Sequence, residues 1–135
     1  MTEQKIILIV EDETVLQKVI VAVFAKNGIK TMSARSVEEA KKVAKDANKI
    51  DAIWLDHYLV GQESGLDFLA WCKQDDNKKL NLIPFYVVTN TAAPDAVATY
   101  VHFGAKEYYV KSDHRLEDIV KTVLAQLSNP SVTAR

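Results

Sequence analysis

Three carboxylates, a hydroxyl and an amine directly follow apolar stretches of this sequence. They are Glu11 and Asp12 after "KIILIV", Asp56 after "DAIWL", Thr89 after "LIPFYVV" and Lys111 after "EYYV". Carboxylates held a few Å apart repel one another, which raises some of their pKa values and costs stability unless a cation neutralises them. An all-oxygen site with few protein ligands suits Mg²⁺, which commonly shares its coordination shell with phosphate oxygens. If the fold brings them together, these residues predict a Mg²⁺ site that handles a phosphoryl group.

An aspartate in such a set can act as the nucleophile of phosphoryl transfer and form an aspartyl phosphate. The metal ion and a lysine would offset charge on the transferred oxygens, which is most of what catalysis of this step requires. The Thr89 hydroxyl could hydrogen-bond one of these oxygens, and a bond of this kind contributes about 1.5–3 kcal/mol. The residue types therefore favour phosphoryl transfer to a carboxylate.

The elements that must position these residues alternate along the chain. Short apolar runs predict strands over residues 5–10, 29–34, 51–55, 82–88 and 107–110. Between and after them, apolar residues recur at helical spacing: Leu16, Val19, Ile20 and Val23; Val37, Ala40, Ala44 and Ala47; Leu66, Leu69 and Ala70; Val97, Tyr100 and Val101; and Leu116, Ile119, Val120, Val123, Leu124 and Leu127. Strict alternation predicts a parallel sheet covered on both faces. Ligands of such sheets bind at the carboxyl ends of the strands.

Local signals support several helix boundaries. Gly28 indicates the end of the first helix, and Ser36 with Glu39 forms a capping box that opens the second. Pro94 suits the first turn of the fourth helix, whose pattern runs to Gly104. These signals place the candidate residues in loops just beyond the strands.

Composition limits the class of protein. The 135 residues suit one domain, expected over residues 1–128, with 129–135 as a disordered tail. A net charge of −1, from 17 basic and 18 acidic residues, does not favour nucleic acid or a membrane surface as a partner. The chain shows no signal peptide or membrane span, so we expect a cytoplasmic protein. Cys72 is the only cysteine, and no chemistry is assigned to it.

Taken together, Glu11-Asp12, Asp56, Thr89 and Lys111 resemble the receiver domain of bacterial two-component response regulators. The resemblance covers residues 5 to about 128, and "FGAKEYYVK" is similar to the family's approach to its lysine. It implies a three-layer, flavodoxin-like (βα)5 fold with strand order 2-1-3-4-5. Because no output domain follows the last helix, we expect a stand-alone receiver similar to the chemotaxis response regulator.

The resemblance also assigns roles by position. Asp56 would be the phosphoacceptor, with Asp12 and Asp56 as direct ligands of Mg²⁺, or of Mn²⁺. Glu11 would be a ligand through water, and the backbone carbonyl of Tyr58 would complete the protein's share of the metal shell.

The phosphate-binding and switch roles would fall to three further residues. Lys111 would pair with the acyl phosphate, Thr89 would be the switch hydroxyl and Tyr108 the switch aromatic. The phosphoryl group would come from a sensor histidine kinase, a histidine phosphotransfer protein or a small phosphodonor. The surface of the fourth helix, fifth strand and fifth helix would contact a protein target or form a homodimer. The chain would catalyse only its own phosphorylation and dephosphorylation, so we do not expect an enzyme.

Four positions depart from the family's pattern. Ser112 replaces a proline that usually follows a cis bond, so either a non-proline cis bond or a different loop is expected. Val60 stands where proline is common, and Gly65 comes one residue later than the usual glycine. Asn90 replaces a small residue and would narrow access to the phosphate or add a hydrogen bond.

The remaining histidines and aromatic residues have less specific interpretations. His57 is expected to be a solvated neighbour of the site or a gate beside it, and His102 and His114 to be surface residues. Trp54 and Trp71 should pack in the core. A last group is either ordinary cover of the sheet or, if exposed together, a partner site: Tyr100, His102, Phe103 and Tyr109.

Two other functions remain open. A degenerate receiver could serve as a docking module that needs no phosphorylation, although the retained site residues argue against this. An aspartyl phosphohydrolase is the other, because "VEDETV" faintly resembles the haloacid dehalogenase pattern. There, Thr14 stands where a second aspartate is needed for acid–base work.

Overall fold

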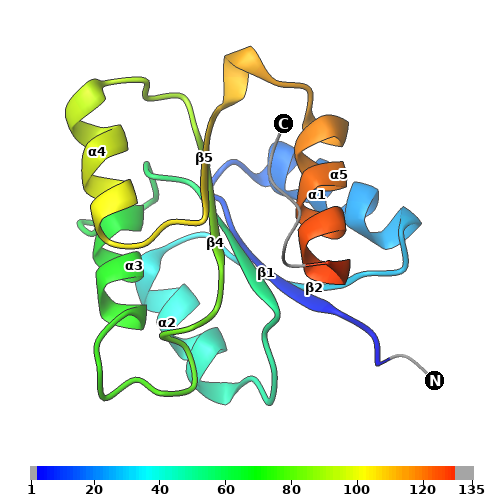
Figure 1. The fold of residues 1–135 in the computed structure, drawn as a ribbon, viewed down its shortest axis with the longest axis horizontal. Helices are drawn as coiled ribbons and strands as arrows, with labels where there is room; N and C mark the ends of the chain where they lie inside the picture. The colour runs from blue at the N-terminus through cyan, green and yellow to red at the C-terminus, as the bar shows by residue number, and fades with distance from the viewer. Residues whose placement is uncertain (1–2, 130–135) are drawn as a thin grey trace.

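Five parallel strands form the centre of the computed structural model, which describes residues 3–129 (Figure 1). The strands are β1 (Ile6–Val10), β2 (Lys30–Ala34), β3 (Ala52–Leu55), β4 (Phe85–Thr89) and β5 (Glu107–Val110). Their order in the sheet is β2-β1-β3-β4-β5. The predicted doubly wound fold and its strand order are confirmed.

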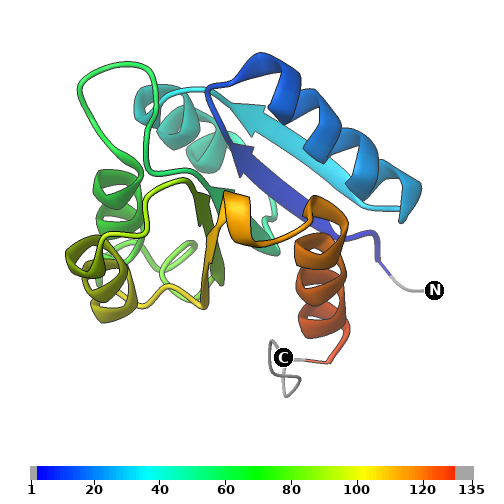
Figure 2. The same ribbon diagram turned by 90° about the horizontal axis from the view of Figure 1, so that it is seen from above.

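Helices cover both faces of the sheet. They are α1 (Thr14–Lys26), α2 (Val37–Asp46), α3 (Gly65–Cys72), α4 (Pro94–His102) and α5 (Leu116–Ser128), with a short 3-10 helix η1 (Lys111–Asp113). Helices α1 and α5 lie on one face, and α2, α3 and α4 lie on the other (Figures 1 and 2). Within residues 3–129, no helix has the length and apolar character needed to cross a membrane. Of the predicted tail, residues 130–135 lie outside the part of the chain that the structure describes.

The three central strands are buried on both faces, as their continuous apolar sequences predict. Side chains alternate along β1, so Ile7 and Ile9 join the core under α1 and α5, while Leu8 and Val10 join the core under the other helices. Trp54 is fully buried in the first of these cores, which confirms its predicted packing role.

Strand register aligns the ends of β1 and β3. Val10 pairs with Leu55, and the ladder continues one step further because the Asp56 N–H donates to the Val10 carbonyl at 3.0 Å. On the other side of β1, the Glu11 N–H donates to the Ala34 carbonyl at 3.0 Å. These bonds fix the backbone of Glu11 and Asp56 side by side at the carboxyl edge of the sheet.

The apolar residues of α1 differ in burial. Val19 is 44% exposed, whereas Ile20 and Phe24 are fully buried and Leu16 and Val23 are partly buried. Ile20 and Phe24 lie four residues apart, one helical turn, and so share the face that packs on the sheet. The helical spacing predicted for α1 is therefore present, with Val19 at the margin of its buried face, and the stripe predicted for α5 is confirmed.

This difference within α1 is testable with two truncations. Ile20→Ala should lower the free energy of unfolding by about 2–5 kcal/mol, because it removes buried contacts and leaves a cavity. Val19→Ala, one position earlier, should lower it by less than about 0.5 kcal/mol. Urea denaturation measures both values, and equal losses would show that the helix packs in a different rotation.

Candidate functional site

Three carboxylates meet at the carboxyl ends of β1 and β3. Glu11, Asp12 and Asp56 each place one carboxylate oxygen within 4.8 Å of the other two. Glu11 is fully buried and Asp56 is 5% exposed. Burying ionised carboxylates is costly unless cations or hydrogen bonds compensate them. The predicted convergence of these residues is present in the structure, and it requires compensating charge.

Lys111, which follows β5, supplies part of that charge. Its Nζ donates to Glu11 Oε1 at 2.8 Å and to Asp56 Oδ2 at 2.9 Å. Burial alone would lower the pKa of Lys111, but its hydrogen bonds to the two carboxylates and their charges outweigh burial and raise it. The ammonium group therefore stays charged at neutral pH and links β5 to β1 and β3.

One lysine does not fully compensate the cluster. Burial raises the pKa of Glu11 to about 7, and the charge of Asp56 adds to this, against the lowering effect of hydrogen bonds from Lys111 and from the Glu13 N–H. Without a metal ion, Glu11 thus exchanges a proton near neutral pH. A divalent cation beside these oxygens would favour the ionised form.

Two buried oxygen atoms of the site have no hydrogen-bond partner among residues 3–129. They are Asp56 Oδ1 and Thr89 Oγ1, and Thr89 is fully buried at the end of β4. Buried polar atoms in proteins are normally hydrogen-bonded, so such orphans call for an explanation. A carboxylate oxygen beside two further carboxylates fits a hard cation, and a free hydroxyl fits a phosphate oxygen.

The loop after β1 is held by two side chains that the sequence did not single out. Gln17 Nε2 donates to the carbonyl of Glu11 at 2.9 Å and to that of Ala34 at 3.2 Å. Arg35 Nε donates to the carbonyl of Asp12 at 3.0 Å. Long side chains that bind main-chain carbonyls follow no spacing rule, so no motif indicated them.

The carbonyl of Asp56 lies against Gly65 at the start of α3. A Cβ added to Gly65 would come within 2.2 Å of the Asp56 carbonyl oxygen and 3.0 Å of the Tyr100 hydroxyl. The Gly65 N–H donates to the His57 carbonyl at 2.9 Å, and Ser64 and Asp67 form a capping box there. This close approach to the Asp56 backbone therefore explains why position 65 is a glycine.

The loop after Lys111 has a different local structure and no cis bond, which was the second of the two predicted alternatives. Residues 111–113 form η1, and no peptide bond within residues 3–129 is cis. Asn90 is exposed, and its expected influence on the phosphate stays a prediction.

Tyr108 and Tyr58 lie close to the site in sequence but differ in exposure. Tyr108 is half-buried, and its hydroxyl donates to the Thr91 carbonyl at 2.7 Å. Tyr58 is 61% exposed. The switch role of Tyr108 and the metal-binding role of the Tyr58 carbonyl stay predictions.

The aromatic residues near α4 and β5 do not form one exposed cluster. Tyr100 is buried in the core under α2, α3 and α4, whereas Tyr109 is buried in the core under α1 and α5. Phe103 is 41% exposed, and His102 and His114 are exposed, as predicted for the two histidines. Ordinary cover of the sheet therefore describes Tyr100 and Tyr109.

His57, Trp71 and Cys72 have different surroundings in the fold. His57 is partly buried, and its Nδ1 lies 2.5 Å from the Tyr100 hydroxyl, so it contacts the protein as well as solvent. Its role as a gate stays a prediction. Trp71 packs against the core beside Phe68, as predicted. Burial raises the pKa of the Cys72 thiol to about 12, which leaves it neutral and unreactive.

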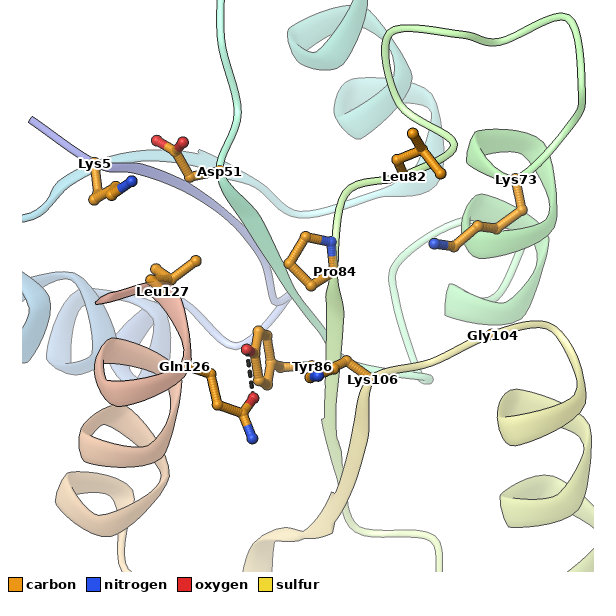
Figure 3. Close-up of a pocket in the computed structure, with 10 residues that line it drawn as sticks. All are labelled: Lys5, Asp51, Lys73, Leu82, Pro84, Tyr86, Gly104, Lys106, Gln126 and Leu127. Atoms are coloured by element: carbon orange, nitrogen blue, oxygen red, sulfur yellow. Dashed lines mark hydrogen bonds between the residues drawn. The ribbon is translucent and has the colours of Figure 1, made fainter. Parts of the chain in front are cut away.

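A cavity of about 470 Å³ lies at the opposite edge of the sheet, around the residues that precede β1, β3, β4 and β5 (Figure 3). Its buried polar groups bind one another: the Tyr86 hydroxyl donates to Gln126 Oε1 at 2.7 Å, and Gln126 Nε2 donates to Glu107 Oε2 at 2.8 Å (Figure 3 shows the first bond). These groups are satisfied, in contrast to Asp56 Oδ1 and Thr89 Oγ1.

The fold and the site define a flavodoxin-like α/β protein with an acidic cluster and a lysine at the carboxyl edge of its sheet. Residues 7–123 match the family model described as the response regulator receiver domain. The chain therefore belongs to the receiver domains of two-component response regulators.

Solved structures of this family share the fold. A CheY-like receiver domain protein from Methanospirillum hungatei is 19% identical, with a TM-score of 0.82 over 93% of this chain and 95% of that one. The phosphorylated cyanobacterial phytochrome response regulator RcpA is 24% identical, with a TM-score of 0.83 over 96% and 98%. The chemotaxis protein CheY4 of Vibrio cholerae is 20% identical, with a TM-score of 0.80 over 91% and 98%. A search among curated proteins found no significant match.

The raised pKa of Glu11 predicts a pH dependence of stability in the absence of metal. Between pH 4.5 and about 7 the folded protein retains a proton on Glu11 that the unfolded chain releases. The free energy of unfolding should therefore fall as pH rises through this range, by at most about 3 kcal/mol from this residue. Urea denaturation in a chelator should show that Glu11→Gln removes this part of the slope. Glu13→Gln, at an exposed position, should keep it, and identical slopes in both variants would contradict the prediction.

The contact at Gly65 predicts a second effect. Gly65→Ala should lower the free energy of unfolding by about 1–3 kcal/mol, because the new Cβ must push the Asp56 carbonyl aside. Amide chemical shifts of residues 55–57 should move with it. Gln62→Ala, at an exposed position of the same loop, is the control and should leave both values unchanged. Unchanged shifts at residues 55–57 in Gly65→Ala would refute the close approach.

Proposed function

We propose that this receiver accepts a phosphoryl group on Asp56 in a Mg²⁺-dependent reaction and thereby controls a protein partner. The observation that carries this proposal is the difference between the hydrogen-bond partners of the two Asp56 carboxylate oxygens. One of its oxygens is held by Lys111 at 2.9 Å, while the other is buried without a partner among the residues the structure describes. Family membership supports the same conclusion.

The groups around Asp56 suit attack on phosphorus. A carboxylate oxygen of Asp56 forms the new O–P bond as the bond from phosphorus to the donor breaks. With a phosphohistidine donor this is a P–N bond, and the imidazole nitrogen keeps its electron pair. Lys111 Nζ then offsets charge on the transferred oxygens, and the Thr89 hydroxyl donates to one of them.

The acidic cluster would hold the metal ion. Asp12 and Asp56 would be direct ligands together with the backbone carbonyl of Tyr58, and Mn²⁺ could replace Mg²⁺. Both Glu11 oxygens already accept hydrogen bonds, from Lys111 and from the Glu13 N–H, which supports a role for Glu11 through water. When bound, the ion neutralises negative charge on the phosphoryl oxygens.

The donor and the output follow from the family. A sensor histidine kinase or a histidine phosphotransfer protein would supply the phosphoryl group, and the catalysis would be limited to the protein's own phosphorylation and dephosphorylation. The surface of α4, β5 and α5, which includes Tyr108, would carry the response to a protein target or to a second copy of the chain.

Incubation with acetyl phosphate and Mg²⁺ tests the phosphoacceptor. Intact-mass spectrometry should show the addition of one phosphoryl group to the wild type and none to Asp56→Asn, because the amide is no nucleophile for this step. Asp113→Asn, at an exposed position in η1, is the control and should react as the wild type does. A chelator should abolish the reaction.

Two results would overturn the proposal. Addition of a phosphoryl group to Asp56→Asn would place the acceptor elsewhere. A wild type that binds Mg²⁺ but gains no phosphoryl group would favour the docking module that needs no phosphorylation.

A further inference from the structure

Helix α4 contributes a single fully buried side chain to the core. Tyr100, in its last turn, is the only fully buried residue of this helix. Its ring lies 5.7 Å from the ring of Tyr108 and 5.5 Å from that of His57, measured between centroids. Val101, the next residue, is 60% exposed. A displacement of Tyr100 should therefore displace the last turn of α4.

The Tyr100 hydroxyl reaches the loop that follows the phosphoacceptor. It lies 2.5 Å from Nδ1 of His57, the residue after Asp56. A Cβ on Gly65 would lie 3.0 Å from the same hydroxyl. The hydrogen bond between Tyr100 and His57 therefore joins the last turn of α4 to the residue that follows Asp56.

The opposite end of α4 is held by the second tyrosine. The Tyr108 hydroxyl donates to the Thr91 carbonyl at 2.7 Å, in the loop that leads into the helix. The N-cap residue of α4, Ala93, has no side chain that can cap the helix. Two tyrosine hydroxyls thus fix the leading loop and the last turn of a helix with little other buried attachment.

We propose that the Tyr100 hydroxyl is a tether that holds the last turn of α4 against the phosphoacceptor loop and makes α4 respond to changes at Asp56. This inference rests on the proposed function for its signalling role, while the tether itself is a property of the unphosphorylated protein. His57 directly follows Asp56 in the chain and is hydrogen-bonded to the Tyr100 hydroxyl. A shift of the Asp56 backbone therefore displaces one partner of this bond. Tyr100 is a positioning residue and touches no reacting atom.

Amide hydrogen exchange of Pro94–His102 tests the tether in the wild type, Tyr100→Phe and His57→Ala. Tyr86→Phe is the matched control, because it also removes a buried hydroxyl bond, to Gln126, but on the other side of the sheet from α4. With a chelator present, exchange in α4 should be at least about fivefold faster in Tyr100→Phe and His57→Ala than in the wild type. Tyr86→Phe should stay within about twofold of it. Exchange in α1 should serve as the measure of global stability.

A second measurement adds beryllofluoride with Mg²⁺ as a mimic of the phosphoryl group. In the wild type, α4 exchange should rise towards the level of Tyr100→Phe, whereas Tyr100→Phe itself should change by less than about twofold. Exchange in α4 of Tyr100→Phe equal to that of the wild type under chelation would refute the tether, whether or not Asp56 is phosphorylated. An equal response of the two proteins to the mimic would refute the coupling. A wild type that acquires no phosphoryl group would count against the proposed function, and the chelated comparison would still decide the tether.

Discussion

The ion pairs between Lys111 and two buried carboxylates are the interaction on which the site depends. Lys111 comes from the end of β5, Glu11 from β1 and Asp56 from β3, so the contacts span most of the sheet. A buried ion pair is weak evidence for stability, because desolvation offsets much of the attraction. Its value here is chemical. It holds a charged amine beside Asp56, the proposed nucleophile, and leaves Asp56 Oδ1 without a partner among residues 3–129.

The sheet makes this arrangement almost unavoidable. Parallel strands bring their carboxyl ends to one edge, and the bonds from the Asp56 and Glu11 N–H groups to neighbouring strands extend the ladder by one residue. Both side chains are thereby buried at the rim while their backbone N–H groups stay hydrogen-bonded. The same rule places Thr89 and Lys111, which end or follow β4 and β5, at that edge.

Much of this could be predicted from the sequence because it follows from local patterns. Apolar runs marked the five strands, and the polar residues after four of these runs marked the candidate site. The residues that the sequence did not indicate make contacts with distant parts of the chain, and such contacts follow no fixed spacing in the sequence. Gln17 and Arg35 bind main-chain carbonyls of Glu11 and Asp12, which leaves no periodicity. The His57–Tyr100 bond joins residues 43 apart in the chain. The sequence around Tyr100 indicated only that this residue lies in a helix. Val19 shares the apolar spacing of α1, but spacing alone did not show that it lies at the margin of the buried face.

The most direct test is a crystal structure of the protein with Mg²⁺ and beryllofluoride. We expect the mimic joined to the Asp56 carboxylate, the metal ion in contact with Asp12 and Asp56, and the Thr89 hydroxyl and Lys111 Nζ within hydrogen-bonding distance of its fluorine atoms. Electron density for the mimic at any other residue would contradict the assignment of Asp56. An unaltered pair of Lys111 bonds to Glu11 and Asp56, with no metal ion at the cluster, would contradict it as well.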